Sequence, residues 1–181
     1  PFNLRQFKRG LIDPQLKYHG SGWNTLVLEN HDQARCVSRF GINTKKYRYE
    51  AATFLAMITY LGWGTPFIYQ GQEIGMTNTD FKSKDEMKDP VSHFIFELAK
   101  GLHIPDRVAF RMMKGAVRDN ARTPMQWGPT VNAGFNKGTE PWQCMNPDYK
   151  KINVLADMSS DRSIYRFYQK LLALRKSEDA L

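Results

Sequence analysis

Two short apolar runs separated by one long helical pattern constrain this 181-residue chain more than any other feature. The runs cover residues 24–28 and 66–69, and both are short enough to be strands. The first run is apolar on consecutive positions, which predicts a strand buried on both faces. Residues 47–61 between them have helical spacing, and the middle of this segment is apolar nearly all round, which predicts a buried helix. A strand, a helix and a strand at this spacing predict a βαβ unit with a parallel sheet.

Helical patterns also occur outside this unit. One covers residues 4–16, and we expect it to end near Pro14. Asp89-Pro90 has the pattern of an N-cap and a first helical turn, and residues 106–114 predict another helix. The last helix is expected at 163–176, with these side chains inward: Ile164, Phe167, Leu171, Leu172 and Leu174.

The remaining segments are long connections. Residues 76–122 form an extended excursion after the second apolar run, and residues 123–157 are rich in Pro, Gly, Asn and Trp, which predicts a long ordered loop. A βαβ unit with elaborate loops after its strands is typical of a barrel or of a doubly wound sheet. No GxGxxG motif or P-loop is present, so we expect no dinucleotide or nucleoside triphosphate cofactor.

Composition narrows the range of partners. The formal charge is +8, but the basic residues are scattered and interrupted by Asp and Glu, so we expect no nucleic-acid partner. No stretch reaches the roughly 18 apolar residues of a membrane span, and we expect no membrane partner. Cys36 and Cys144 are too few for a disulfide framework or a metal site. We therefore expect free thiols, no metal and a cytoplasmic location.

A polar cluster follows the first predicted strand, and it contains His31 and Asp32. Neighbouring side chains along a strand point to opposite faces, so two adjacent residues can bind one ligand only just past the strand end. Strand ends are where barrel enzymes place their active sites. A carboxylate and an imidazole there could bind neighbouring hydroxyls of a sugar, although the same dipeptide also fits a loop cap.

A second polar cluster covers residues 118–127. Arg118 and Arg122 lie on one side of the segment if it is helical. Asn120 and Gln126 beside Trp127 suit a carbohydrate ligand. A loop anchored by arginine–carboxylate pairs explains the same residues, and the chemistry alone leaves both interpretations open.

Three ordered motifs carry a family resemblance. The motifs resemble successive signatures of the α-amylase superfamily, glycoside hydrolase family 13. They are VLENHDQAR at residues 27–35, QGQEIGMTN at 70–78 and RDNARTPMQW at 118–127. They are most similar to its oligo-1,6-glucosidase, α-glucosidase and dextran glucosidase branch. The resemblance implies an α/β fold, the C-terminal segment of a (β/α)8 TIM barrel with strands seven and eight, their helices and a long loop excursion. Residues 1–181 would be a partial catalytic barrel domain, without the upstream strands and the C-terminal all-β domain.

The resemblance also implies roles for single residues. Asp32 matches the catalytic carboxylate that stabilises the transition state in the −1 subsite, and His31 matches its companion on the sugar hydroxyls. Arg118 matches the arginine that closes the −1 pocket, Arg122 one nearer the +1 subsite, and Gln33 a residue facing +1. Glu29 and Glu73 are expected to be structural. Ala34 and Gln72 depart from the family's frequent Pro and Glu, at positions that match no catalytic residue.

The implied activity is that of a retaining α-glucosidase acting on terminal α-1,6 or α-1,4 bonds of short oligosaccharides. Its nucleophile and its acid/base would come from strands four and five, outside this chain, so the partners would be an oligosaccharide substrate and the remainder of the same enzyme. A sucrose isomerase or another transglycosylase is the first alternative, but such relatives often carry Asn at the position of Gln33. A non-catalytic transporter heavy-chain relative is the second, and the intact sugar-site residues argue against it.

Overall fold

The computed structural model describes residues 3–40, 44–114 and 117–178. Its centre is a pair of strands, β1 (Thr25–Val27) and β2 (Thr65–Phe67), which run parallel with Thr25 opposite Thr65. The long helix α3 (Arg48–Tyr60) lies between them in sequence, preceded by the short helix α2 (Cys36–Phe40). The predicted βαβ unit is therefore confirmed, with each strand shorter than its apolar run.

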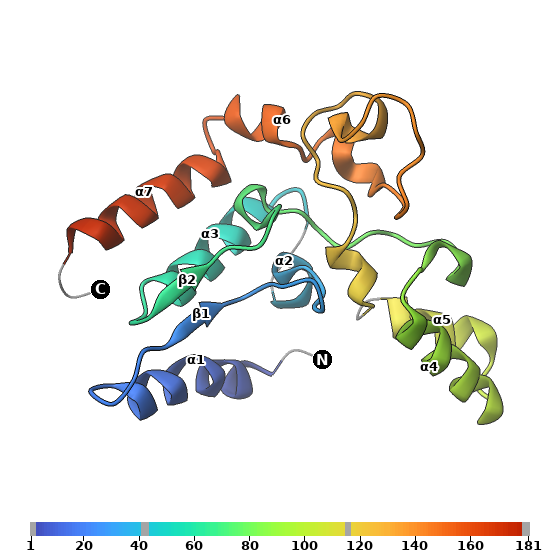
Figure 1. Ribbon diagram of the computed structural model, residues 1–181, viewed down its shortest axis with the longest axis horizontal. Helices are drawn as coiled ribbons and strands as arrows, with labels where there is room; N and C mark the ends of the chain where they lie inside the picture. Colours follow the sequence, from blue (N-terminus) through green and yellow to red (C-terminus); the bar gives the residue numbers. More distant parts are fainter. Residues whose placement is uncertain (1–2, 41–43, 115–116, 179–181) are drawn as a thin grey trace.

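Two further helices flank this unit. In Figure 1, α1 (Leu4–Tyr18) and α7 (Ile164–Ser177) lie on opposite sides of the strand pair, and α7 packs on α3. The main hydrophobic core is formed by β1, α2, α3 and α7, and Phe7 of α1 packs against it. It contains Leu26, Leu28, Cys36, Val37, Ala52, Leu55, Ala56, Tyr60, Ile164, Tyr168 and Leu171.

The strands are buried on one face only, which corrects the expectation for residues 24–28. Leu26 is buried in the core, whereas Val27 is 43% exposed and Phe67, opposite it in the sheet, is 54% exposed. Successive side chains of a strand point to opposite faces, and the described helices cover only the face of Leu26. Helix α3 is not buried all round either, because its side chains Phe54 and Met57 are exposed.

Two helix predictions also need correction. Helix α1 continues through Pro14 to Tyr18, because proline removes one backbone donor while the hydrogen bonds on either side of it can persist. In α7 the buried residues are Ile164, Tyr168 and Leu171, whereas Leu174 is 46% exposed. Tyr168 was missed because its ring is buried while its hydroxyl meets the Gln72 side chain at 3.0 Å.

The excursion after β2 carries a helical pair that lies apart from the sheet (Figure 1). Helix α4 (Pro90–Gly101) starts at the predicted N-cap, where the Asp89 side chain accepts a hydrogen bond from the Val91 amide at 3.3 Å. Helix α5 (Asp106–Lys114) packs on α4 and also confirms its prediction. Their shared core contains Phe81, Met87, Phe96, Ala109, Met113 and Val117.

The rest of the chain is built from short turns. The loop predicted at 123–157 contains 3-10 turns at Val131–Gly134 and Pro147–Lys150 and ends in the short helix α6 (Val154–Met158). Other 3-10 turns lie at Gln72–Ile74, Lys84–Glu86 and Arg118–Ala121. Within the described ranges, every helix is too short or too polar to cross a membrane.

The contact of α7 with the core gives a stability prediction. Ile164 is completely buried, so Ile164→Ala should lower the free energy of unfolding by about 2–5 kcal/mol, through lost burial and a residual cavity. The exposed Leu174 on the same helix is the matched control, and Leu174→Ala should change it by about 0.5 kcal/mol or less. Urea denaturation followed by circular dichroism measures both, and equal losses would contradict the described packing of α7.

Candidate functional site

The site begins where β1 ends. Past the strand the chain turns, and the Asn30 side-chain oxygen accepts a hydrogen bond from the Asp32 amide at 2.8 Å. This turn presents both His31 and Asp32 to solvent, with side chains 71% and 46% exposed. The His31 Nε2 lies 3.3 Å from Asp32 Oδ2. The two adjacent side chains therefore lie together beyond the strand end, as their positions in the sequence predict.

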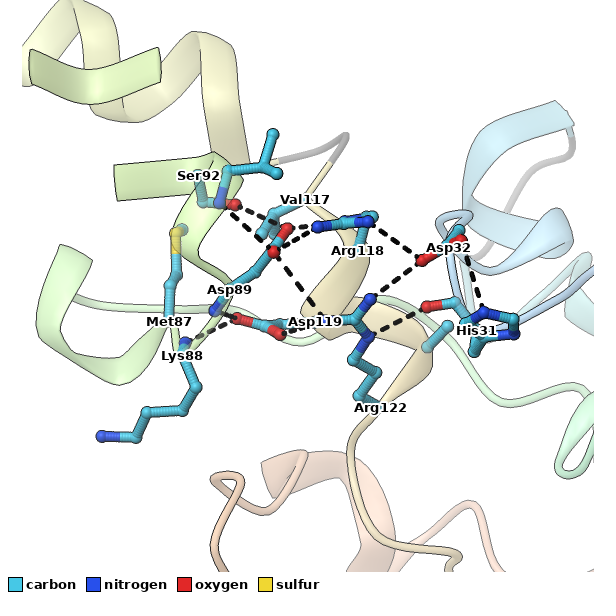
Figure 2. A network of polar contacts seen from close by, with 12 residues as sticks. His31, Asp32, Met87, Lys88, Asp89, Ser92, Val117, Arg118, Asp119 and Arg122 are labelled. Atoms are coloured by element: carbon cyan, nitrogen blue, oxygen red, sulfur yellow. Dashed lines mark hydrogen bonds and ion pairs between the residues drawn. The ribbon is translucent and has the colours of Figure 1, made fainter. Parts of the chain in front are cut away.

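Two arginines from a distant part of the chain hold the Asp32 carboxylate. Arg118 Nη1 donates to Asp32 Oδ1 at 3.2 Å, and Arg122 Nη2 donates to the same oxygen at 2.9 Å. Arg122 Nε also donates to the His31 carbonyl at 3.0 Å. The 3-10 turn Arg118–Ala121 places both arginines on one side, as predicted for a helical segment (Figure 2).

A buried carboxylate lies behind the arginines. Asp89 is almost fully buried, and its two oxygens accept hydrogen bonds from Arg118 Nη2 at 2.5 Å and Nε at 2.8 Å. Arg122 Nη1 lies 3.8 Å from the same carboxylate. The hydrogen bonds from Arg118 hold the pKa of Asp89 below its ordinary value, and Asp89 in turn raises the pKa of Arg118.

A third carboxylate, Asp119, orders the backbone around Asp89. Its Oδ2 accepts the amide protons of Lys88 at 2.6 Å and of Asp89 at 2.9 Å. Its Oδ1 lies 3.8 Å from Arg122 Nη1. Figure 2 shows the resulting chain of charges, in which Arg118 lies between Asp89 and Asp32. Both guanidiniums are thus fixed from the protein side while they reach the exposed Asp32.

The sequence did not identify Asp89 as a site residue. The Asp-Pro pattern is fully explained by a helix N-cap, and the Asp89 side chain does cap α4. Its bond to Arg118 links positions 29 residues apart, for which the sequence gives no periodic signal. The signal that could have found Asp89 is the interpretation of residues 118–127 as a loop anchored by arginine–carboxylate pairs.

Gln33 lies next to this group but contacts a different partner. Its side-chain oxygen accepts a hydrogen bond from Arg39 Nη1 at 2.6 Å. The structure therefore brings together His31, Asp32, Arg118 and Arg122 and leaves Gln33 at the edge.

The carbohydrate interpretation of Asn120 and Gln126 is wrong, because both are completely buried. The Asn120 side chain accepts from the Thr79 amide at 2.9 Å, and Gln126 Nε2 donates to Asp148 Oδ1 at 2.7 Å. Buried amides with such partners hold the loop together and cannot reach a ligand. Trp127 beside them is half exposed.

Two other carboxylates near the strand ends, Glu29 and Glu73, are not exposed to solvent. Glu29 is buried and accepts from Arg35 Nη1 at 3.2 Å and from the Cys36 amide at 2.7 Å. Burial raises the pKa of Glu73.

Cys36 and Cys144 are free thiols, as predicted. Across residues 3–40, 44–114 and 117–178, no cluster of three His, Cys, Asp or Glu side chains is arranged to hold a metal ion.

Comparison with known proteins decides the family. Residues 1–181 match the alpha amylase catalytic domain. This chain belongs to the α-amylase family. It is 44% identical to the oligo-1,6-glucosidase of Parageobacillus thermoglucosidasius, and 39% identical to the trehalose-6-phosphate hydrolase of Bacillus subtilis. These matches cover 100% and 99% of this chain and 32% of each relative, so the chain spans about a third of their length.

Solved structures of the α-amylase family agree with this assignment. The trehalose-6-phosphate hydrolase of Bacillus licheniformis superimposes with a TM-score of 0.92 at 40% identity. The isomaltulose synthase of Erwinia rhapontici NX5 gives a TM-score of 0.91 at 36% identity. Both comparisons cover 98% of this chain and 32% of the other. The resemblance is therefore confirmed, and the chain has the fold of part of an α-amylase catalytic barrel.

The buried Asp89 gives a prediction about pH. Its pKa is lowered in the native state, so its contribution is complete above the unfolded value of about 3.9 and is lost as the pH falls through the lower native value. Asp89→Asn should therefore cost about 1.5–3 kcal/mol of unfolding free energy at pH 7, the range for hydrogen bonds to charged groups. The difference from the wild type should shrink below pH 4.

Denaturant unfolding of both proteins at several pH values between 3 and 7 checks this expectation. Glu97→Gln on the exposed side of α4 is the control. Its ion-pair partners in the described part of the chain are the surface residues Lys84 and Lys100, so Glu97 should contribute little at any pH. A constant difference between Asp89→Asn and the wild type across this range would contradict the described role of the Asp89 carboxylate.

Proposed function

We propose that this chain supplies part of the sugar site of a retaining α-glucosidase that hydrolyses terminal α-1,6 or α-1,4 glucosidic bonds of short oligosaccharides. The proposal rests on the exposed Asp32 carboxylate at the end of β1, held by Arg118 and Arg122. In this assignment β1 and β2 are barrel strands seven and eight. The remainder of the same enzyme supplies the other strands of the barrel domain, of which residues 1–181 are one part.

Asp32 would stabilise the transition state in the −1 subsite. Glycoside hydrolysis passes through an oxocarbenium-like sugar, whose ring flattens as positive charge develops. Both arginines bind Asp32 Oδ1, and Oδ2 lies beside the exposed His31 imidazole. Oδ2 is thus the oxygen that can meet a sugar hydroxyl. A hydrogen bond that tightens as the ring flattens favours the transition state over the ground state and so raises the rate.

The neighbouring residues take complementary roles in this proposal. His31 contacts adjacent hydroxyls of the same sugar, and Arg118 closes the −1 pocket. Arg122 and Gln33 lie toward the +1 subsite. Because Gln33 bonds to Arg39 in the structure, a sugar in +1 would compete with that hydrogen bond.

The bond-breaking pair is assigned to the remainder of the enzyme. A retaining glycosidase needs two carboxyl groups about 5–5.5 Å apart, one as nucleophile and one as acid/base. In the described part of the chain, the side chains that pair with the Asp32 carboxylate are all basic: His31, Arg118 and Arg122. Asp89 and Asp119 are nearby, but both are buried and bonded to arginine or backbone donors.

A sucrose isomerase is the second candidate. The likeness to the isomaltulose synthase structure, at 36% identity, supports it. The two functions differ in whether water or a sugar captures the glucosyl intermediate. Gln33 favours hydrolysis, because the resemblance associates Asn at this position with the isomerases.

We also propose a cytoplasmic location. The two cysteines are free, and Cys36 is buried in the core. Burial and the neighbouring Glu29 raise the pKa of the Cys36 thiol well above its ordinary value, which makes it a poor nucleophile. Free thiols of this kind are typical of proteins in reducing compartments.

The role of Asp32 is tested in the full-length enzyme. Asp32→Asn keeps the shape of the side chain but removes its charge, and should lower kcat/KM on isomaltose or maltose by on the order of 10²–10³-fold or more. Glucose release measures this. Analysis of the products from isomaltose, maltose and sucrose in the same assay separates hydrolysis from isomerisation.

Two outcomes would contradict the proposal. One is a variant with the full activity of the wild type, and the other is a wild-type enzyme that releases no glucose from any of these sugars. Glu97→Gln is a suitable control, since it changes an exposed carboxylate on α4 and should leave kcat/KM unchanged.

The isolated 181-residue chain should be inactive. In the part of the chain that the structure describes, the side chains paired with the Asp32 carboxylate are basic, and a retaining glycosidase needs two carboxyl groups at the bond it breaks. Incubation of the purified chain with an aryl α-glucoside, followed by release of the phenol, should show no turnover. Clear turnover that is lost in Asp32→Asn would show that this chain breaks the bond by itself, and would contradict the assignment of the bond-breaking pair to the remainder of the enzyme.

A further inference from the structure

A fully buried arginine, Arg35, lies close to the proposed sugar site but is not among the residues proposed to bind the sugar. The Arg35 side chain is 0% exposed, and its partner Glu29 is 1% exposed. A buried guanidinium is costly unless ion pairs and hydrogen bonds compensate its charge. This makes the position of Arg35 strongly dependent on the groups around it, and the positions of those groups dependent on Arg35.

The partners of Arg35 come from three separate segments. Arg35 Nη1 binds Glu29 at the end of β1 at 3.2 Å and the Gln70 carbonyl after β2 at 2.6 Å. Arg35 Nη2 lies 3.5 Å from the Ala121 carbonyl. One guanidinium therefore connects the ends of both strands with the turn that carries Arg118 and Arg122.

These contacts lie close in sequence to the proposed sugar site. Glu29 and Arg35 are both three residues from Asp32, one before and one after it, and Ala121 directly precedes Arg122. The Ala121 carbonyl also accepts a hydrogen bond from the Tyr69 hydroxyl at 3.1 Å, and the Tyr69 ring lies 5.4 Å from the Arg35 guanidinium. The turn that carries the arginines is thus held from β1 and β2 together.

We propose that Arg35 is a positioning residue for the Asp32 subsite, fixing the strand end that carries Asp32 against the turn that carries Arg118 and Arg122. Asp32 is nearly half exposed, so packing alone does not fix its side chain. Its position depends on the backbone and on the two arginines. Misplacement of a catalytic group by about 1 Å can cost about 10²-fold in rate.

The inference rests on the proposed function, and its test uses the full-length enzyme. Arg35→Lys keeps the buried charge but loses the planar fork that reaches several acceptors at once. We expect kcat on isomaltose or maltose to fall about 10- to 100-fold, with KM within about threefold. Inhibition by 1-deoxynojirimycin, a cationic glucose analogue, should weaken by a similar factor to kcat/KM, while inhibition by glucose changes little.

Arg175→Lys is the matched control. Arg175 also binds several backbone carbonyls, those of Tyr60 at 2.9 Å, Gly62 at 2.5 Å and Gly64. These groups precede β2, at the opposite end of the strand from Gln70. A purely structural role of an arginine that binds several carbonyl groups would affect both variants alike, in melting temperature and in activity. We expect Arg175→Lys to lower only the melting temperature.

Tyr69→Phe is the second variant, and it decides the matter if Arg35→Lys does not fold. It keeps the Glu29–Arg35 ion pair and removes only the hydroxyl that holds Ala121, so kcat should fall about 3- to 10-fold.

Wild-type kcat in a folded Arg35→Lys, or in Tyr69→Phe where Arg35→Lys fails to fold, overturns the inference. An equal fall of kcat in Arg175→Lys and Arg35→Lys also overturns it. A wild-type enzyme without α-glucosidase turnover overturns the proposed function and this inference with it, whereas an active enzyme with unaffected variants overturns the inference alone.

Discussion

The buried ion pair between Glu29 and Arg35 connects the parts of this structure that otherwise meet only at their ends. β1 and β2 are three residues long each, too short to fix the loops that follow them by strand pairing alone. The loops after both strands and the 118–122 turn converge on the Arg35 guanidinium. A buried charge is costly unless ion pairs and hydrogen bonds compensate it. Loop arrangements that remove these partners are therefore unfavourable, and one arrangement is preferred.

The exposed end of the site depends on a second set of charges. Asp32, Asp89 and Asp119 alternate with Arg118 and Arg122, so each guanidinium lies between carboxylates. The inner carboxylates are buried and bound to backbone amides, whereas Asp32 is open to solvent. The buried carboxylates therefore hold the arginines on the protein side, and one oxygen of the exposed Asp32 carboxylate remains available for a ligand. Without Asp89, Arg118 would keep its hydrogen bond to the exposed Asp32, whereas Arg122 would keep its contacts with Asp32, Asp119 and the His31 carbonyl.

Much of this could be predicted from local patterns, and the remainder depends on distant contacts. Apolar runs indicated both strands, and the Asp89 N-cap indicated α4, because these signals act within a few residues. The grouping of His31, Asp32, Arg118 and Arg122 came from family motifs, since no local rule relates positions 86 residues apart. Burial was predicted less well: the sequence of β1 suits two covered faces, and the described helices cover one. Arg35 was missed because nothing in a sequence marks an arginine as buried.

The uncovered face of the strand pair bears on how the site would work. Val27 and Phe67 are paired in the sheet and exposed together, on the face opposite Leu26. Parallel sheets are normally covered on both faces, and in barrels the second face is the packed interior. In the proposed enzyme the remaining strands would bury this face and fix the direction of β1. Arg35 would then fix the position of Asp32 relative to Arg118 and Arg122. Packing in the barrel interior would fix the position of the whole chain relative to the carboxyl groups that break the bond.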